Sequence, residues 1–121
     1  MCSSDLLDIV RAKFAAFNRH DADAIERLYA TAATLHSPDY PTLTGNQLIG
    51  DTYRRLFAAV PDAKDTLALL ERAGSHVYAQ FVLSGHLHGA QAQPISVRLI
   101  SVYQVRGAHI AEDVTYYDRK P

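Results

Sequence analysis

The sequence contains a single cysteine, Cys2, among its 121 residues. One cysteine excludes a disulfide framework within the chain and is typical of proteins from a reducing compartment. The sequence also lacks an apolar run near the ~18 residues that a transmembrane helix needs. Its N-terminus carries Asp5 and Asp8, where a signal peptide would be basic. We therefore expect a cytoplasmic protein that has no membrane partner.

An excess of charge of either sign is missing as well. The 12 Lys and Arg residues nearly balance the 13 Asp and Glu residues, and the basic residues occur singly or in pairs. A protein that binds nucleic acid needs a basic face to neutralise phosphates. The sequence therefore argues against nucleic acid as a partner.

Two common functional motifs are absent. Gly45, Gly50 and Gly107 are isolated from one another, so the glycine-rich phosphate loop G-x-x-x-x-G-K is excluded. The sequence has no G-x-S-x-G nucleophile elbow, and Cys2 has no base fixed near it. Nucleophilic catalysis therefore has little support.

The composition that remains is that of an ordinary globular protein. Hydrophobic residues make up 48% of the chain and charged residues 21%, and 121 residues suffice for one hydrophobic core. No repeat, low-complexity segment or linker divides the sequence. We therefore expect a single domain over residues 1–121.

The first half of the sequence has the periodicity of helices. After a helix-start sequence at Ser3–Asp5, an apolar stripe occupies Leu6, Leu7, Val10, Phe14 and Phe17. Asp21 has the position of an N-cap for a second, short helix. A third helix is expected over residues 46–59, ahead of a proline that ends it. Between the second and third helices we expect a strand over 33–37 and a turn-rich loop over 37–41.

From Asp65 onward the period changes to two, which is typical of strands. Strands are expected over residues 66–71, 76–88, 95–105 and 109–118. Helices followed by a meander of antiparallel strands form an α+β pattern, with the helices on one face of a curved sheet. In the last strand, alternation places Asp113, Thr115 and Tyr117 on one face. A carboxylate, a hydroxyl and a phenol on a shared face suit a pocket better than a dry core.

Six short phrases follow one another along almost the whole chain. They are FAAFNRHDAD at 14–23, LYATAATLHSP at 28–38, LTG at 43–45, FAAVPD at 57–62, LSGHLHG at 83–89 and IAEDVTYYD at 110–118. In this order they resemble the NTF2-like superfamily, which includes SnoaL-type polyketide cyclases and ketosteroid isomerases. The resemblance implies an NTF2-like cone, in which three N-terminal helices pack on a strongly curved, mostly antiparallel β-sheet that encloses a pocket.

The residues that ketosteroid isomerases use are missing from this chain. Those enzymes set a carboxylate base against an oxyanion hole made of a tyrosine and a protonated aspartic acid. Against that pattern, the base falls on Ser37, the protonated aspartic acid on Ser101 and the tyrosine on Phe14. A serine hydroxyl has no pKa suited to removing a proton from carbon, so steroid isomerisation by this mechanism is not expected. SnoaL-like relatives also carry a longer insert where only 90–94 remain, which disfavours a polyaromatic substrate.

Asp113 is the leading candidate for a catalytic acid or base. In an apolar cavity its carboxyl would be desolvated, which raises a carboxyl pKa toward a useful range. Three roles remain open: catalysis, pocket lining without catalysis, and a structural role in which Asp113 faces outward or forms an ion pair with Arg98 or Arg106. His36 is a second catalytic candidate because histidine suits proton shuttling near neutral pH. Its alternative role is that of a half-buried histidine bonded to the backbone.

Other residues of the expected pocket are candidates for substrate binding: Phe14, Tyr53, Phe57, Leu99, Ser101, Tyr103, Thr115 and Tyr117. The phenols of Tyr53, Tyr103 and Tyr117 could reach a ligand carbonyl, although a buried tyrosine is more often a core residue. His86 and His88 point the same way on one strand, but zinc needs further ligands from elsewhere. We therefore expect no metal, and the resemblance to SnoaL-like cyclases implies that no cofactor is needed.

The sequence thus predicts a SnoaL-like protein with a small-molecule pocket. Its predicted activity is that of a cofactor-free isomerase, cyclase or lyase that transfers a proton on a small apolar carbonyl compound bound in the cone. A non-catalytic ligand-binding or dimerisation module is the alternative. A homodimer through the convex sheet face is expected, because that face is unusually apolar at Tyr78, Val82, Ile100, Val102, Val114 and Tyr116.

Overall fold

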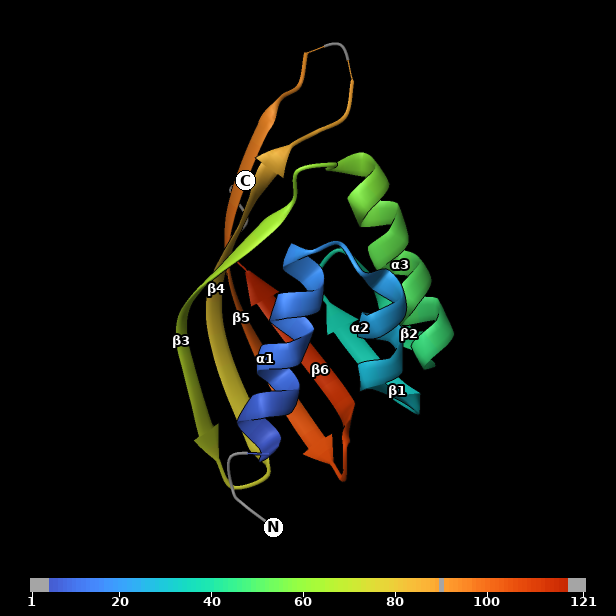
Figure 1. The fold of residues 1–121 in the computed structure, drawn as a ribbon, viewed down its shortest axis with the longest axis vertical. Coiled ribbons are helices and arrows are strands. Elements are labelled where there is room, and N and C mark those ends of the chain that lie inside the picture. The colour runs from blue at the N-terminus through green and yellow to red at the C-terminus, as the bar shows by residue number, and fades with distance from the viewer. Residues whose placement is uncertain (1–4, 90, 118–121) are drawn as a thin grey trace.

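A computed structural model describes residues 5–89 and 91–117 of the chain. Three helices lie on one side of a curved, six-stranded open sheet (Figure 1). The elements are α1 (Asp5–Asn18), α2 (Ala22–Leu28), β1 (Tyr29–Ser37), β2 (Tyr40–Thr44), α3 (Asn46–Ala59), β3 (Lys64–Ala73), β4 (His76–His86), β5 (Pro94–Arg106) and β6 (His109–Tyr117). The expected α+β class is confirmed. Cys2, the helix start at Ser3 and Ser4, and Asp118 lie outside the described residues.

The sheet has the strand order β2-β1-β6-β5-β4-β3. Neighbouring strands are antiparallel except β1 and β6, which run parallel with Leu35 opposite Asp113. Register shifts interrupt the pairing in β1, β3 and β5. Because such irregularities bend a strand and increase its twist, the sheet curves toward the helices.

The first half of the chain differs from the expected succession of helices. The strand β1 follows α2 directly, and β2 occupies Tyr40–Thr44, so that it begins inside the loop expected over 37–41. The turn contains only Pro38 and Asp39. Pro41 misled the prediction, although proline is tolerated on an edge strand because its missing N–H breaks no bond of the sheet interior. β2 is such an edge strand, so α3 comes after two strands.

The junction between α1 and α2 is held by local contacts. His20 adopts a positive φ of 57°, which ends α1, and its ring stacks on Phe57 with centroids 4.5 Å apart. The Asp21 carboxylate accepts a hydrogen bond from the Ala24 N–H at 3.0 Å, which confirms the predicted N-cap of α2. These contacts place the second helix beside the end of α3.

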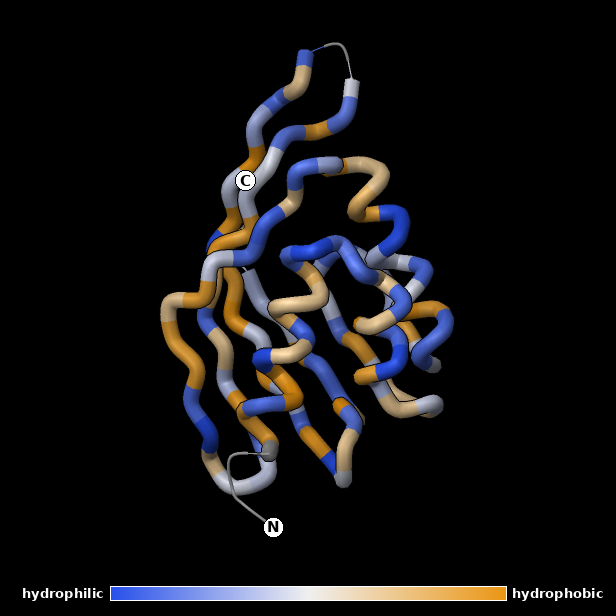
Figure 2. Tube along the Cα trace, viewed as in Figure 1, coloured by the Kyte–Doolittle hydropathy of each residue, from blue (hydrophilic) through white to orange (hydrophobic). Residues whose placement is uncertain are grey.

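The hydrophobic core lies between the helices and the concave face of the sheet (Figure 2). Val10, Phe14 and Phe17 of α1 are buried there, as the apolar stripe predicted. At the end of β4, Gly85 has a φ of 154°, and a Cβ at this position would lie 2.5 Å from Val60 Cγ1. Glycine therefore allows the residue that ends α3 to pack directly against the strand.

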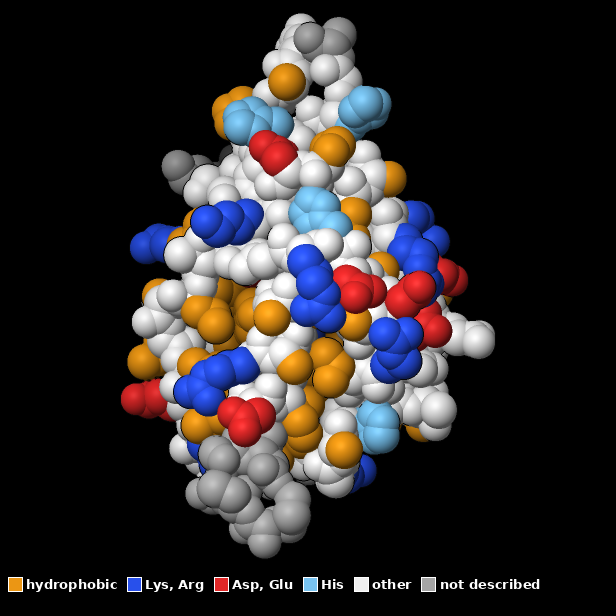
Figure 3. All heavy atoms as spheres, viewed as in Figure 1, with side chains coloured by type: hydrophobic (Ala, Val, Ile, Leu, Met, Phe, Trp, Pro, Cys, Tyr) orange, Lys and Arg blue, Asp and Glu red, His pale blue; other side chains and the backbone are white. Residues whose placement is uncertain are grey.

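The helical face of the molecule carries paired charges. Over α2 and α3, Arg54 forms ion pairs with Asp23, Glu26 and Asp51, and Figure 3 shows basic and acidic side chains side by side there. Such pairs fix the two helices to each other without creating a basic patch on this face. Among the described residues, no helix has both the length and the apolar character needed to cross a membrane.

Candidate active site

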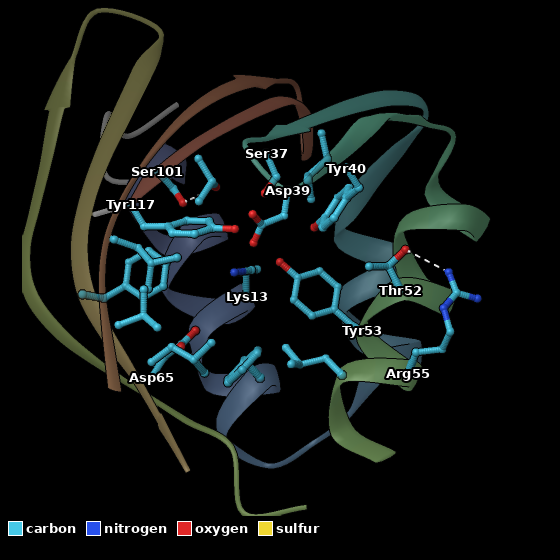
Figure 4. Close-up of a pocket in the computed structure, with 18 residues that line it drawn as sticks. Lys13, Ser37, Asp39, Tyr40, Thr52, Tyr53, Arg55, Asp65, Ser101 and Tyr117 are labelled. Carbon is cyan, nitrogen blue, oxygen red and sulfur yellow. Dashed lines mark hydrogen bonds between the residues drawn. The ribbon is translucent and has the colours of Figure 1, made fainter. Parts of the chain in front are cut away.

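A cavity of about 470 Å³ lies between the helices and the concave face of the sheet (Figure 4). Its wall is largely apolar, with Phe17, Leu35, Leu56, Phe81, Leu83, Val97 and Leu99. The polar lining residues are Lys13, Ser37, Asp39, Tyr40, Thr52, Tyr53, Arg55, Asp65, Ser101, Thr115 and Tyr117. A chamber that combines apolar walls with convergent polar groups is the usual form of a small-molecule site.

Lys13 lies at the centre of this chamber. Its side chain rises from α1 among the buried stripe residues and is only 2% exposed. The ammonium nitrogen lies 4.5 Å from the ring centroid of Phe14 and 5.2 Å from that of Tyr53. Phe17, Phe81 and Tyr103 complete an aromatic cage at 5.7–5.8 Å. At these distances the ring faces attract the cation.

The charge of Lys13 is retained despite its burial. Burial alone would lower the pKa of this ammonium group, because it removes the water that solvates the charge. The electrostatic influence of Tyr103, Tyr53, Asp65 and Asp113 outweighs burial and raises the pKa of Lys13 well above its usual range. Lys13 takes part in none of the ion pairs found among the described residues. The raised pKa favours the charged form of Lys13, which lines the cavity.

Asp65, at the start of β3, is the buried carboxyl group that lines the cavity. Its backbone is fixed by the Asn18 side chain, whose amide donates to the Asp65 carbonyl at 2.9 Å and accepts from its N–H at 2.8 Å. The carboxyl is 4% exposed, and its Oδ1 has no hydrogen-bond partner among the described residues. Burial raises the pKa of Asp65 to about 6, against the opposing charge of Lys13. This value suits a group that gains and loses protons near neutral pH.

Asp113 faces the interior, behind the cavity wall. It is 1% exposed and accepts hydrogen bonds from the Tyr29 hydroxyl at 2.6 Å and the Thr115 hydroxyl at 2.8 Å. Burial raises the pKa of Asp113, whereas Lys13 and these two hydrogen bonds lower it. Its partners are thus interior hydroxyl groups and not the arginines proposed from sequence. Thr115 lines the cavity and Asp113 does not.

The structure places His36, the second catalytic candidate, outside the lining of the cavity. In the parallel pairing of β1 and β6, Leu35 lies opposite Asp113 and His36 opposite Val114. His36 therefore projects from the other face of the sheet, where its Nδ1 lies 2.9 Å from Thr42 Oγ1 and its Nε2 lies 3.4 Å from Glu112. With 40% of its side chain exposed, it contacts surface groups and not the cavity.

Five of the eight residues predicted to bind substrate line the cavity, namely Tyr53, Leu99, Ser101, Thr115 and Tyr117. The other three pack behind the wall. The Phe14 ring lies 4.9 Å from Phe81, the Phe57 ring lies 5.1 Å from Phe17, and Tyr103 is fully buried. Packing between rings therefore explains why these three residues do not line the cavity.

The turn between β1 and β2 contributes a polar mouth that sequence analysis did not identify. Ser37, Asp39 and Tyr40 line the cavity from this side. Figure 4 shows the Asp39 carboxylate and the Tyr40 phenol directed toward the chamber above Lys13. Reading this segment as a loop concealed its position, because only the return of β2 brings it over the cavity.

The histidines of β4 belong to a different part of the molecule. His86 pairs with Asp62 at 2.7 Å, through its ring and through its backbone N–H. The described residues contain no cluster of three or more His, Cys, Asp or Glu side chains that could hold a metal ion. The expected absence of a metal remains a prediction.

The sequence matches a family model for the SnoaL-like domain over residues 10–113. The chain belongs to the SnoaL-like family. The matched range includes Lys13 of α1 and ends at Asp113 of β6. No curated protein is similar enough in sequence to match this SnoaL-like chain.

Solved structures place this SnoaL-like protein in the NTF2-like fold. A protein of ketosteroid isomerase-like fold from Catenulispora acidiphila, in complex with trimethylamine, is 31% identical, covering 91% of this chain and 85% of its own, with a TM-score of 0.83. A protein from a Jannaschia species, proposed to be a SnoaL-like polyketide cyclase, is 14% identical over 95% and 86% of the two chains, with a TM-score of 0.85. An LEH-like epoxide hydrolase of M. tuberculosis is 14% identical over 95% and 84%, with a TM-score of 0.82.

Proposed function

We propose that this SnoaL-like protein is a cofactor-free enzyme that transfers protons on a small, largely apolar carbonyl compound. The observation that carries the proposal is that two buried groups line one apolar cavity, namely the carboxyl of Asp65 and the ammonium of Lys13. Isomerases, cyclases and lyases of carbonyl compounds share a first step, in which a base removes a proton next to the carbonyl. The cavity offers both a base and a positive charge for that step.

Asp65 has the properties that the base requires. Its Oδ1 lacks a protein partner among the described residues, and its pKa of about 6 leaves the group largely ionised at neutral pH. A base whose pKa lies near the operating pH is the most effective. The Asn18 side chain holds the backbone of Asp65 in place at the cavity wall.

Lys13 supplies the complementary charge. When a proton leaves the carbon, negative charge develops on the carbonyl oxygen, and a preorganised cation in a water-poor site stabilises that charge strongly. The Tyr53 phenol, which Figure 4 shows directed toward Lys13, can donate a hydrogen bond to the same oxygen. Asp65 would then be the base, with Lys13 and Tyr53 as stabilisers of the oxyanion.

The position of the Lys13 ammonium also argues against a cationic substrate. The relative from Catenulispora acidiphila forms a complex with trimethylamine, a small amine. In this chain the aromatic cage already surrounds the ammonium of Lys13. A second cation beside it would be repelled, so a neutral carbonyl compound fits the cavity better than an amine does.

The fold alone does not decide between catalysis and binding, because 455 chains of solved structures match it. The alternative is a non-catalytic ligand-binding module with the same cavity. A buried carboxyl with an unpartnered oxygen favours catalysis over binding, since an unpaired buried polar atom destabilises the fold. A protein that only binds an apolar ligand would gain nothing from such an unpartnered oxygen.

Deuterium exchange into a simple ketone tests the proposal. Cyclohexanone in D₂O is incubated with the protein, and loss of its α-hydrogen signal is followed by proton NMR. We expect the wild-type protein to accelerate exchange and Asp65→Asn to reduce the rate by about 100-fold or more. Glu71→Gln, which removes an exposed carboxylate from the same strand, serves as the control and should leave the rate unchanged. Binding of cyclohexanone without exchange would support the binding module instead.

The outer face of the sheet supports a further proposal, that of a homodimer. Tyr116 is 56% exposed on this face, and Tyr78 and Ile100 are also exposed. Cross-strand pairing places these residues on one surface, with Ile100 opposite Tyr116 and Tyr78 opposite Val102. An apolar sheet face of this kind is typical of a contact between subunits.

A further inference from the structure

A chain of hydrogen bonds connects the cavity wall with the buried carboxyl of Asp113. Ser101 on β5 and Thr115 on β6 are cross-strand partners, and their hydroxyl oxygens lie 2.6 Å apart (Figure 4). The Thr115 hydroxyl donates to Oδ1 of Asp113 at 2.8 Å, and Tyr29 donates to Oδ2 at 2.6 Å. Ser101 and Thr115 line the cavity, whereas Asp113 lies behind them.

We infer that Ser101 and Thr115 form a relay through which Asp113 exchanges a proton with the oxygen atom of a ligand in the cavity. A hydroxyl group carries one proton and two lone pairs, so it can accept a proton on one side and release its own on the other. The distances of 2.6 and 2.8 Å are those of direct hydrogen bonds. No further group is needed between the carboxyl and the cavity.

The direction of the relay depends on the charge of Asp113. An ionised Asp113 only accepts, so the Thr115 proton points to it, the Ser101 proton points to Thr115, and Ser101 offers lone pairs to the ligand. A protonated Asp113 can reverse this order. Its O–H bond then breaks as Thr115 accepts the proton, Thr115 releases its own proton to Ser101, and Ser101 releases its proton to the ligand oxygen. Asp113 ends as a carboxylate, and the reverse sequence restores it.

This inference rests on the proposed function and adds a second proton-transfer group to it. Asp65 would remove the proton from carbon, and the relay would supply a proton to the carbonyl oxygen, which gives the neutral enol. Ser101 is the group that touches the ligand, while Thr115 and Asp113 are positioning residues that act through it. The relay therefore favours substrates whose oxygen can both accept and return a proton.

Several other groups influence Asp113 and must be separated from the relay in a test. They are Lys13 on α1, Tyr29 and His36 on β1, Tyr40 on β2, Tyr53 on α3 and Tyr103 on β5. Their electrostatic effects act through space and persist when a single hydroxyl is removed. The relay needs both hydroxyls, so it is lost when either Ser101 or Thr115 is changed. This difference makes the inference testable.

The experiment uses Thr115→Val and Ser101→Ala, which break the relay, and Thr115→Ser, which keeps it. Thr34→Val, which removes a hydroxyl on β1 at the position that precedes the buried Leu35, is the control. Two quantities are measured: the rate of deuterium exchange into cyclohexanone, and the pKa of Asp113 from carboxyl-carbon NMR with and without saturating cyclohexanone.

We expect cyclohexanone to shift the pKa of Asp113 in the wild type, in Thr115→Ser and in the control. The shift should vanish in Thr115→Val and Ser101→Ala, and kcat should fall by about tenfold or more with little change in KM. A shift that persists in Thr115→Val, or no shift in the wild type, would overturn the relay.

If Asp65→Asn abolishes exchange while Thr115→Val leaves it unchanged, the proposed function stands and the relay falls. If the wild type shows no exchange, the proposed function falls, and the pKa measurement alone decides on the relay.

Discussion

Asp65→Asn is expected to flatten the pH dependence of the protein's stability. Burial raises the pKa of Asp65 from its ordinary 3.8 to about 6, so between these pH values the folded protein holds a proton that the unfolded chain has released. The stability contributed by this group is therefore fully present below about pH 4 and is lost as the pH rises to about 6. At 1.36 kcal/mol per pKa unit, the loss reaches up to about 3 kcal/mol.

The assay is urea denaturation of the wild type and of Asp65→Asn at about pH 4 and about pH 8, with the free energy of unfolding extrapolated to water. The variant buries an amide with few partners, which lowers stability by about 1–3 kcal/mol at every pH. The difference in the free energy of unfolding between the variant and the wild type is compared at the two pH values, and its change isolates the contribution of the carboxyl. The variant should gain stability relative to the wild type at high pH. The free energy of unfolding of Glu71→Gln should change with pH in the same way as that of the wild type. Parallel curves for Asp65→Asn would refute the raised pKa and, with it, the role of Asp65 as a poised base.

Two further predictions concern the cation and the sheet face. Lys13→Met should slow exchange into cyclohexanone by about 100-fold and should raise the pKa of Asp65 further, because the ammonium lowers it. Carboxyl-carbon NMR measures that pKa, and an unchanged value would show that Lys13 does not act on Asp65. Tyr116→Lys should convert the proposed dimer to a monomer in sedimentation experiments, whereas Ala15→Lys, at an exposed position of α1, should not. A monomeric wild type would contradict the dimer.

Periodicity predicted the parts of the fold in which local sequence decides structure. The expected third helix, 46–59, agrees with α3 because Gly45 precedes it and Pro61 follows. The alternation of β6 placed Asp113 and Thr115 on one face, and both side chains point to the inner side of the sheet. These predictions depend only on which residues repeat and where the repeat ends, which a single sequence contains.

Lys13 and Asp65, the buried charged residues that line the cavity, could not be predicted in the same way. Lys13 lies three residues after Val10 and four before Phe17, inside the apolar stripe of α1, and this position was the available signal. A lysine in a helix is usually solvated, so its burial becomes clear only with the aromatic rings that surround it. Asp65 has no local signal, since its position depends on Asn18, which is 47 residues away.

The charged residues at the surface and those in the interior contribute differently to stability. Arg54 and its three acidic partners lie at the surface, where ion pairs join helices at little energetic cost. Lys13, Asp65 and Asp113 lie inside, where apolar residues of similar volume are often equally or more stabilising. Groups that conflict with good packing are most often found at functional sites. Lys13 and Asp65 line one cavity and Asp113 lies behind its wall, so the chemistry of this SnoaL-like protein is best sought there.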